Sequence, residues 1–225
     1  IYEGSETAIV AITGVSGGDA SETGTQSETI TITDNESAPT VTLSTSASSV
    51  AENGSDLTLT ATLSVATTAD VTVTLTGTGT STAGTDYASL STITISAGST
   101  TGTTTFNPTN NSIYEGSETA IIAITGVSGG SATENGAQSQ TITITDSLSA
   151  PTVTLSTSAS SVAENGSDLT LTATLNRQTF EDVTVTLTGT GTSTAGTDYA
   201  SLSTITISAG TVSYTHLTLP TKRIV

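Results

Sequence analysis

The chain has 225 residues, no cysteine, methionine or tryptophan, and a formal net charge of −17 from 20 acidic and three basic residues. Without cysteine, disulfides and thiolate metal sites are excluded, and the negative charge disfavours binding to nucleic acid or to anionic membrane surfaces. No apolar run is long enough to cross a membrane, so no membrane insertion is expected of this segment. Serine, threonine and glycine surround a regularly spaced apolar third, which is typical of exposed β-sheet rather than of disorder.

The chain repeats itself. A shift of 112 residues superposes Ile1–Gly98 on Ile113–Gly210, and only 13 of the 98 aligned pairs differ. Near-identity at a fixed period indicates a tandem array, and a period of this length indicates a whole domain per copy. A Ser-Ala-Pro turn at 37–39 recurs at 149–151, and we place the start of a copy at each of these turns. We therefore expect the end of one copy in 1–36, a complete copy in 37–148 and the start of a third in 149–211.

The last residues depart from the pattern. Residues 212–225 hold the single histidine and two of the three basic residues, Lys222 and Arg223. The string VSYTHLTLPTKRIV resembles the translation of a transposon end used in sequencing libraries. We therefore expect 212–225 to be a non-native tail.

Seven segments of the complete copy alternate apolar and polar residues, as half-buried strands do. We letter them A to G in chain order, and residues 1–36 should hold only F and G, residues 149–211 only A to E. Short antiparallel strands with one buried face predict an all-β fold of tandem immunoglobulin-like, Greek-key, seven-strand sandwiches. The expected strands are Thr40–Ser46, Leu57–Leu63, Val71–Thr76, Leu90–Ser96, Gly102–Asn107, Thr119–Thr125 and Ser139–Thr145.

Alternating strand directions would bring the A–B, C–D and E–F loops and the end of G to one pole. That pole would carry five carboxylates and two amides. Like charges so close repel unless a cation neutralises them, and Ca²⁺ suits oxygen ligands on flexible loops. The alternative, that acidic loops only keep the protein soluble, stays open at this point. The residues are Glu52, Asp86, Asn110, Asn111, Glu115, Glu118 and Asp146.

Two motifs resemble the Calx-beta domain: AGTDYASLSTITISAG at 83–98, and NNSIYEGSE at 110–118. The resemblance extends over nearly all of residues 1–210. It implies an immunoglobulin-like sandwich with calcium sites at one end of the domain. Transferred position by position, it implies that the ligands are Glu52, Glu115, Glu118, Asp146 and the main-chain carbonyl of Ile113.

The sequence also departs from the family pattern. Asn110 and Asn111 stand where the family has paired aspartates, and Thr78 stands where an acidic residue is expected, so one or two ions are predicted rather than a full cluster. Asp86 and Asp198 of the G-T-D-Y motif are expected to form turns rather than to bind metal. The full set of candidate metal ligands, with counterparts in the other copies, is Glu52, Asn110, Asn111, Ile113, Glu115, Glu118, Asp146, Glu3, Glu6, Asp34 and Glu164.

The leading hypothesis is a non-enzymatic, calcium-binding structural module of a large, secreted, adhesin-like bacterial surface protein, in which calcium stiffens a stalk. The expected partners are neighbouring copies, a second molecule in head-to-tail self-association, and host or surface glycans bound by domains outside this segment. One alternative is a calcium-dependent carbohydrate-binding module, against which stands the 3% content of aromatic residues. Another is an accessory repeat of a secreted enzyme. An active site in the repeats themselves is disfavoured because near-identical copies rarely each carry one.

Overall fold

The computed structural model describes residues 1–164 and 166–219. Its regular elements there are sixteen strands, β1 to β16, and these residues include no helix long and apolar enough to cross a membrane. The chain forms two compact units. One comprises residues 1–50, 54–109 and 119–144, and the other comprises 51–53, 110–118 and the described residues from 145 onward. The boundary passes between Glu118 and Thr119, inside one strand, β9 (Glu118–Ser128).

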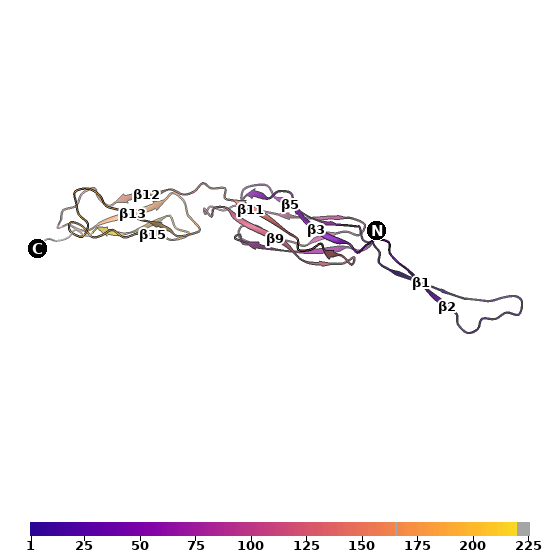
Figure 1. Cartoon of the computed structure of the whole chain (residues 1–225). Helices are drawn as coiled ribbons and strands as arrows, with labels where there is room; N and C mark the ends of the chain where they lie inside the picture. Colours follow the sequence, from indigo (N-terminus) through magenta and orange to yellow (C-terminus); the bar gives the residue numbers. More distant parts are fainter. Residues whose placement is uncertain (165, 220–225) are drawn as a thin grey trace. The chain divides into compact units, whose positions relative to one another are not determined.

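The complete copy is a sandwich of two sheets, which confirms the predicted all-β fold (Figure 1). One sheet has the order β10-β3-β5-β8 and the other the order β4-β11-β9-β6-β7. Predicted strand A corresponds to β3, and a further strand that was not predicted, β4, follows it in the other sheet. The two-residue β10 adds a short parallel pairing to β3. The bounds are β3 (Thr40–Thr45), β4 (Ser49–Ala51), β5 (Leu57–Leu63), β6 (Val71–Gly79), β7 (Ile93–Ile95), β8 (Thr101–Phe106), β9 (Glu118–Ser128), β10 (Thr133–Glu134) and β11 (Ser139–Thr145).

The core lies between the inner faces of these sheets and follows the alternation of the sequence. In β5, Leu57, Leu59 and Leu63 are buried while the intervening threonines are less so. Burying a large aliphatic side chain contributes roughly 1.5–3 kcal/mol, so the facing isoleucines of β7, β9 and β11 supply much of the stability. The main buried residues are Val41, Leu59, Val71, Val73, Ile93, Ile95, Phe106, Ile122, Ile142 and Ile144.

An aromatic pair closes one end of this core. The rings of Tyr87 and Phe106 stack with their centroids 4.9 Å apart, and both side chains are buried. Gly77 in β6 makes room for this arrangement, because a Cβ at that position would overlap the Tyr87 hydroxyl. Gly77 therefore serves the packing of Tyr87 from within strand C.

Residues 1–36 form a hairpin. β1 (Glu6–Ala11) pairs antiparallel with β2 (Ser27–Ile32), with Ala8 opposite Ile30. The shift of 112 residues aligns these strands with β9 and β11, the strands F and G of the complete copy. Apolar side chains on this pair, among them Val10, Ile30 and Ile32, are exposed, whereas the matching positions of the complete copy are buried.

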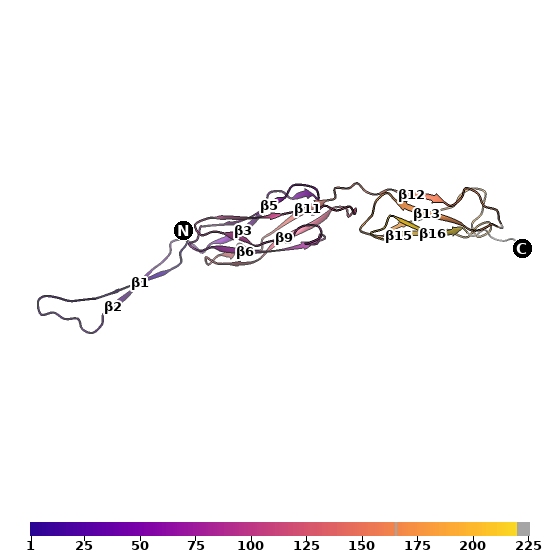
Figure 2. The ribbon, with the colours of Figure 1, turned by 180° about the vertical axis from the view of Figure 1, so that it is seen from behind.

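The third copy holds strands β12 (Val153–Thr157), β13 (Leu169–Leu175), β14 (Val183–Val185), β15 (Ile205–Ile207) and β16 (Ser213–Leu219). They form a sheet β12-β13-β16 and a pair β14-β15 (Figure 2). β16 pairs with β13 as β8 pairs with β5 in the complete copy. Strand E of this copy is therefore built from 213–219, which the sequence assigned to the tail. The non-native origin of 212–225 stays a prediction, and residues 220–225 lie outside the described part.

Candidate metal centre

The turn between β8 and β9 is shaped by an asparagine. The amide oxygen of Asn111 accepts a hydrogen bond from the backbone N–H of Ile113 at 2.6 Å, the local pairing by which asparagine forms a turn. The same side chain donates through Nδ2 to Oε2 of Glu115 at 2.8 Å. Asn111, predicted as a ligand, thus orients Glu115. The predicted role of the Ile113 carbonyl remains a prediction.

Asp146, directly after β11, holds the far side of this turn. Its Oδ2 accepts from the N–H groups of Glu115 at 2.6 Å and Gly116 at 3.1 Å, while its Oδ1 accepts from Leu148 N–H at 2.7 Å. The hydroxyl of Ser147 donates to Oδ1 of Asn110 at 2.6 Å. Asp146 and Asn110 therefore fix the turn to the end of strand G, and their role as metal ligands remains a prediction.

The first copy repeats this arrangement. Asp34 accepts from the N–H groups of Glu3 at 2.7 Å, Gly4 at 2.8 Å and Glu36 at 2.9 Å. The bonds from Glu36 and then Glu3 hold the pKa of Asp34 well below its usual value of 3.8. Its carboxylate therefore stays charged, and the support it gives to the turn is present at neutral pH and is lost only in strong acid.

The C–D loop brings a further carboxylate to this end of the sandwich. Asp86 is buried, and its Oδ2 accepts from Thr82 N–H at 2.6 Å, so the predicted turn-forming role is correct. Burial, and then the negative charge of Asp86, raise the pKa of Tyr87 above its usual 10.0. The loop is bound to the start of β9 because Ser81 donates to the carbonyl of Thr119 through both its N–H, at 3.1 Å, and its hydroxyl, at 2.9 Å.

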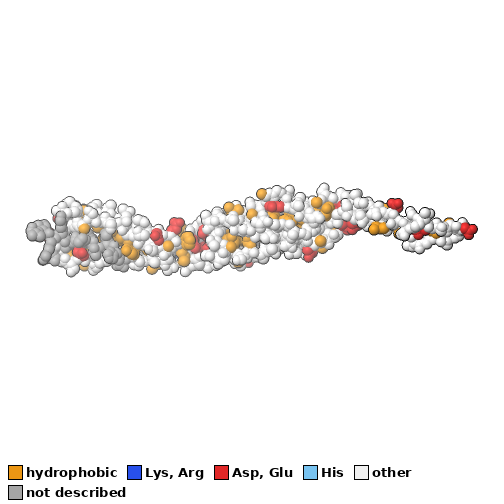
Figure 3. Space-filling model, turned by 90° about the horizontal axis from the view of Figure 1, so that it is seen from below, with side chains coloured by type: hydrophobic (Ala, Val, Ile, Leu, Met, Phe, Trp, Pro, Cys, Tyr) orange, Lys and Arg blue, Asp and Glu red, His pale blue; other side chains and the backbone are white. Residues whose placement is uncertain are grey.

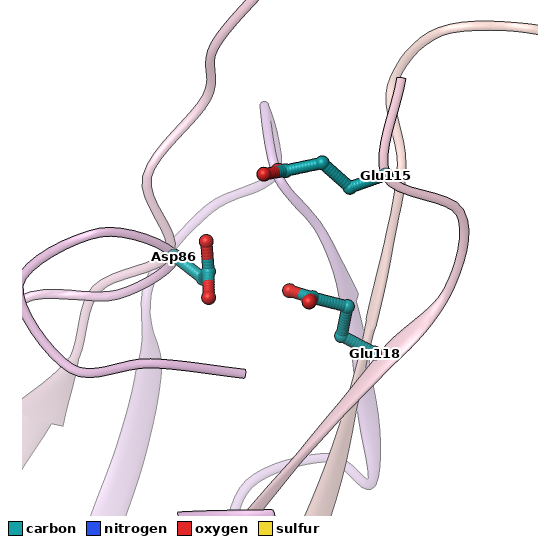
Figure 4. Close-up of side chains that lie close together, drawn as sticks. All are labelled: Asp86, Glu115 and Glu118. Atoms are coloured by element: carbon teal, nitrogen blue, oxygen red, sulfur yellow. The ribbon is translucent and has the colours of Figure 1, made fainter. Parts of the chain in front are cut away.

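Glu118 directly precedes Thr119, so this pairing places it beside the C–D loop. Asp86, Glu115 and Glu118 each offer a carboxylate oxygen, and these oxygens all lie within 4.8 Å of one another. Figure 4 shows the three carboxylates directed toward one common space. Three carboxylate oxygens are hard donors that Ca²⁺ accepts, with carbonyls or water completing its six to eight ligands. The residues present therefore fit a calcium ion.

The structure thus brings together two of the predicted ligands, Glu115 and Glu118, and adds Asp86. The sequence pattern places Asp86 among the carboxylates of this pole but predicts that it forms a turn. The structure shows both features, since its Oδ2 accepts from Thr82 N–H and the residue offers a carboxylate oxygen to the cluster. The sequence feature that could have indicated Asp86 as a ligand is the G-T-D-Y motif, which recurs at 84–87 and 196–199.

Two predicted ligands from the A–B loop differ from each other. Glu52 is buried and its N–H donates to the carbonyl of Thr145 at 3.0 Å. Its counterpart Glu164 is exposed. Glu3 and Glu6 match Glu115 and Glu118, but this chain contains no counterpart of Asp86 for their copy.

Acidic side chains occur at separate places on the face of the molecule shown in Figure 3, among mostly uncharged polar groups. No basic side chain is visible there among the described residues. The sequence has only three lysine and arginine residues against 20 acidic ones, so counter-charge from basic side chains is scarce.

No family model matches the chain, and no curated protein matches it significantly. Among solved structures, the apo form of a Calx CBD1 domain aligns with 48% of this chain and 97% of its own, at 17% identity and a TM-score of 0.41. CBD12 from CALX1.2 aligns with 80% of this chain and 74% of its own, at 15% identity and a TM-score of 0.42. A two-domain protein of unknown function from Bacteroides fragilis aligns with 63% and 67%, at 10% identity and a TM-score of 0.36.

Proposed function

We propose that the complete copy is a calcium-binding structural module of an extracellular, adhesin-like bacterial surface protein. In this proposal the chain performs no catalysis, and calcium stiffens a row of copies. The observation that carries the proposal is the cluster of Asp86, Glu115 and Glu118, whose carboxylate oxygens lie within 4.8 Å of one another.

The three carboxylates come from two different segments, the C–D loop and the turn that leads into β9. Without a cation their mutual repulsion pushes these segments apart, and with one it is replaced by attraction to a common centre. Asn111 and Asp146 act on the same turn through their hydrogen bonds to Glu115. Calcium would supply charge neutralisation, while the chain's own residues supply the position of each oxygen.

A contact with the next copy adjoins the cluster. Tyr114, next to Glu115, donates its N–H to the carbonyl of Gln178 at 2.9 Å and accepts from Phe180 N–H at 3.0 Å. The first copy repeats this contact, since Tyr2 N–H donates to the carbonyl of Ala66 at 2.8 Å. An ion that orders the turn before β9 would therefore order a segment that holds the following copy, which supports a role in stiffening.

Calcium titration of the whole chain tests the proposal. Calcium that binds only the folded state adds about 2.7 kcal/mol of stability at 100 times its Kd. We expect a higher Tm in calcium than in chelator, and loss of most of that difference in the double variant Glu115→Gln, Glu118→Gln. Glu28→Gln is the matched control, because it removes a charge at a position where the complete copy already has Gln140.

A Tm unchanged by calcium in the unsubstituted chain would overturn the calcium site. Stiffening has its own measurement, small-angle scattering of the chain with calcium and with chelator. We expect a narrower distribution of distances with calcium, and the same distribution in both conditions for the double variant. If calcium binds but does not narrow the distribution of distances, the chain is a calcium-binding module and the stiffened-stalk hypothesis is wrong.

A further inference from the structure

The B–C loop is the one place where the complete copy and the third copy differ in sequence. Residues 37–98 and 149–210 align without gaps, and all five of their differences fall in the loop that reads SVATTA at 64–69 and NRQTFE at 176–181. Thr68 is replaced by Phe180, and Ala69 is replaced by Glu181. Loops on a constant scaffold are the usual place for binding residues. The pattern therefore indicates that this loop has a role of its own in the third copy.

The loop keeps the same hydrogen bonds in both copies. Asp70 accepts from Ala97 N–H at 2.8 Å, and Asp182 accepts the equivalent bond from Ala209 N–H at 2.8 Å. The threonine at the centre of the loop donates to the carbonyl two residues later in each copy. The five differences therefore change the side chains that the loop presents and leave its course unchanged.

The differing side chains are presented to solvent. Phe180 is 63% exposed, and Glu181 is exposed as well. Their counterparts Thr68 and Ala69 are also exposed in the complete copy, where strands F and G are in place. The exposure of these two positions is therefore a property of the loop in a complete domain.

Phe180 and Glu181 line a cavity of about 240 Å³ together with the turn that leads into β9. Tyr114 and Glu115 line it on the side of that turn, and Asp182 adds a third acidic residue. Main-chain bonding joins the turn to the loop, since Phe180 N–H donates to the carbonyl of Tyr114 at 3.0 Å. Two aromatic and three acidic residues therefore line one hollow, which we call the B–C pocket.

An arginine side chain suits this lining. Its planar guanidinium stacks on aromatic rings and donates paired hydrogen bonds to carboxylates. The cavity is smaller than the roughly 300–1,000 Å³ of pockets for drug-sized ligands, which matches a single side chain. Arg177, the one lysine or arginine among the described residues, does not line the cavity. We propose that the B–C pocket binds an arginine side chain of a partner protein.

The charge of the whole chain favours the same kind of partner. A formal net charge of −17 attracts a basic surface and repels an acidic one. At the counterpart positions of the complete copy, Thr68 and Ala69 provide neither an aromatic ring nor a carboxylate. The copies therefore share one framework but differ in what the B–C loop binds.

An NMR titration of the whole chain with N-acetylarginine N-methylamide, which carries one guanidinium, tests the proposal. In chelator and at constant ionic strength, we expect saturable shifts of the amide signals of 179–183 and little change at 67–71. The second loop is an internal control for unspecific attraction of a cation to an acidic protein. The lysine analogue lacks the planar fork and should bind more weakly. Equal shifts at the two loops, no saturation, or equal binding of the lysine analogue would overturn the proposal.

Substitutions that exchange the two loop sequences test the residues. Phe180→Thr and Glu181→Ala introduce what the complete copy carries at these positions, so both variants should fold. Each should raise the Kd of the probe about three- to tenfold, because one contact of the guanidinium is lost. Asn176→Ser is the matched control, since it makes the same kind of exchange at a loop position that does not line the cavity. An unchanged Kd in both pocket variants would contradict the proposal.

The converse exchange should create a site. The double variant Thr68→Phe, Ala69→Glu places the ring and the carboxylate in the loop of the complete copy, and we expect shifts at 67–71 on addition of the probe. Failure of this variant to respond would mean that these two residues do not make the site. None of these substitutions alters the three carboxylates of the calcium cluster, so the rise of Tm in calcium should persist and the two proposals can fail separately.

Discussion

Residues 37–98 and 149–210 offer an internal comparison, because only five of their 62 aligned pairs differ, all between positions 64 and 69. The first segment forms a nine-residue β6 and a three-residue β4, while the second forms a three-residue β14 and no strand at 161–163. Local propensity is equal in the two, so it does not explain the difference. Strand length here depends on the pairing partner, as expected for β-structure.

The largest expected effect comes from removing one core contact of strand G. Ile142→Ala in the complete copy should lower the free energy of opening of the β5 amides by about 2–5 kcal/mol, because a buried isoleucine is lost and a cavity remains. Ile30→Ala, its exposed counterpart, should change the opening of β1 amides by less than about 0.5 kcal/mol in dilute solution. Hydrogen exchange measures both. If the two substitutions lower the free energy of opening equally, Ile30 is buried by another surface in solution at that concentration.

An intermediate effect is expected at the glycines of strand C. A Cβ at Gly77 would overlap the Tyr87 hydroxyl, and a Cβ at Gly189 would overlap that of Tyr199. Tyr87 is buried against Phe106, so Gly77→Ala should cost about 1–3 kcal/mol through overpacking. Tyr199 is only half-buried and can move aside, so Gly189→Ala should cost less. Hydrogen exchange of β6 and of β14 compares the two, and an equal cost would contradict this explanation.

The smallest effect should be the same in both copies. The hydroxyl of Thr67 donates to the carbonyl of Ala69 at 2.6 Å, and that of Thr179 to the carbonyl of Glu181 at 2.7 Å. Both threonines are buried. Thr67→Val and Thr179→Val should each cost about 1 kcal/mol, the usual net value of one hydrogen bond, because each removes a bond made within the loop itself. A clear difference in local hydrogen exchange would show that the missing strands influence the B–C loop.

Much of the fold was predictable from alternation alone. β5 and β11 have the predicted bounds, because each is central or well paired and has a strict apolar period. Strand C was predicted three residues too short, since the pattern ends at Leu75 while pairing with β9 continues to Gly79. Strand β4, Ser49–Ala51, was not predicted, because it forms only by pairing with β11 in the other sheet.

The candidate site was predictable in part for a similar reason. Glu115 and Glu118 stand in a motif whose spacing is visible in the sequence, and the structure brings them together. Asp86 joins them only because Ser81 binds the carbonyl of Thr119, a contact between residues 38 positions apart. Conversely, the side chains of Asp146 and Asn111 accept hydrogen bonds from backbone N–H groups. The spacing of residues in the sequence does not predict these bonds.

The contact made by Tyr114 has a consequence for the inheritance of such an array. Its two hydrogen bonds join main-chain groups, and the loop that receives it reads NRQTFE in one copy and SVATTA in another. Unequal recombination between near-identical copies adds or removes whole units of 112 residues. Because main-chain groups of the receiving loop make this contact, copies with either loop sequence can form it. Gain or loss of a whole unit therefore still brings together a tyrosine segment and a loop that can receive it.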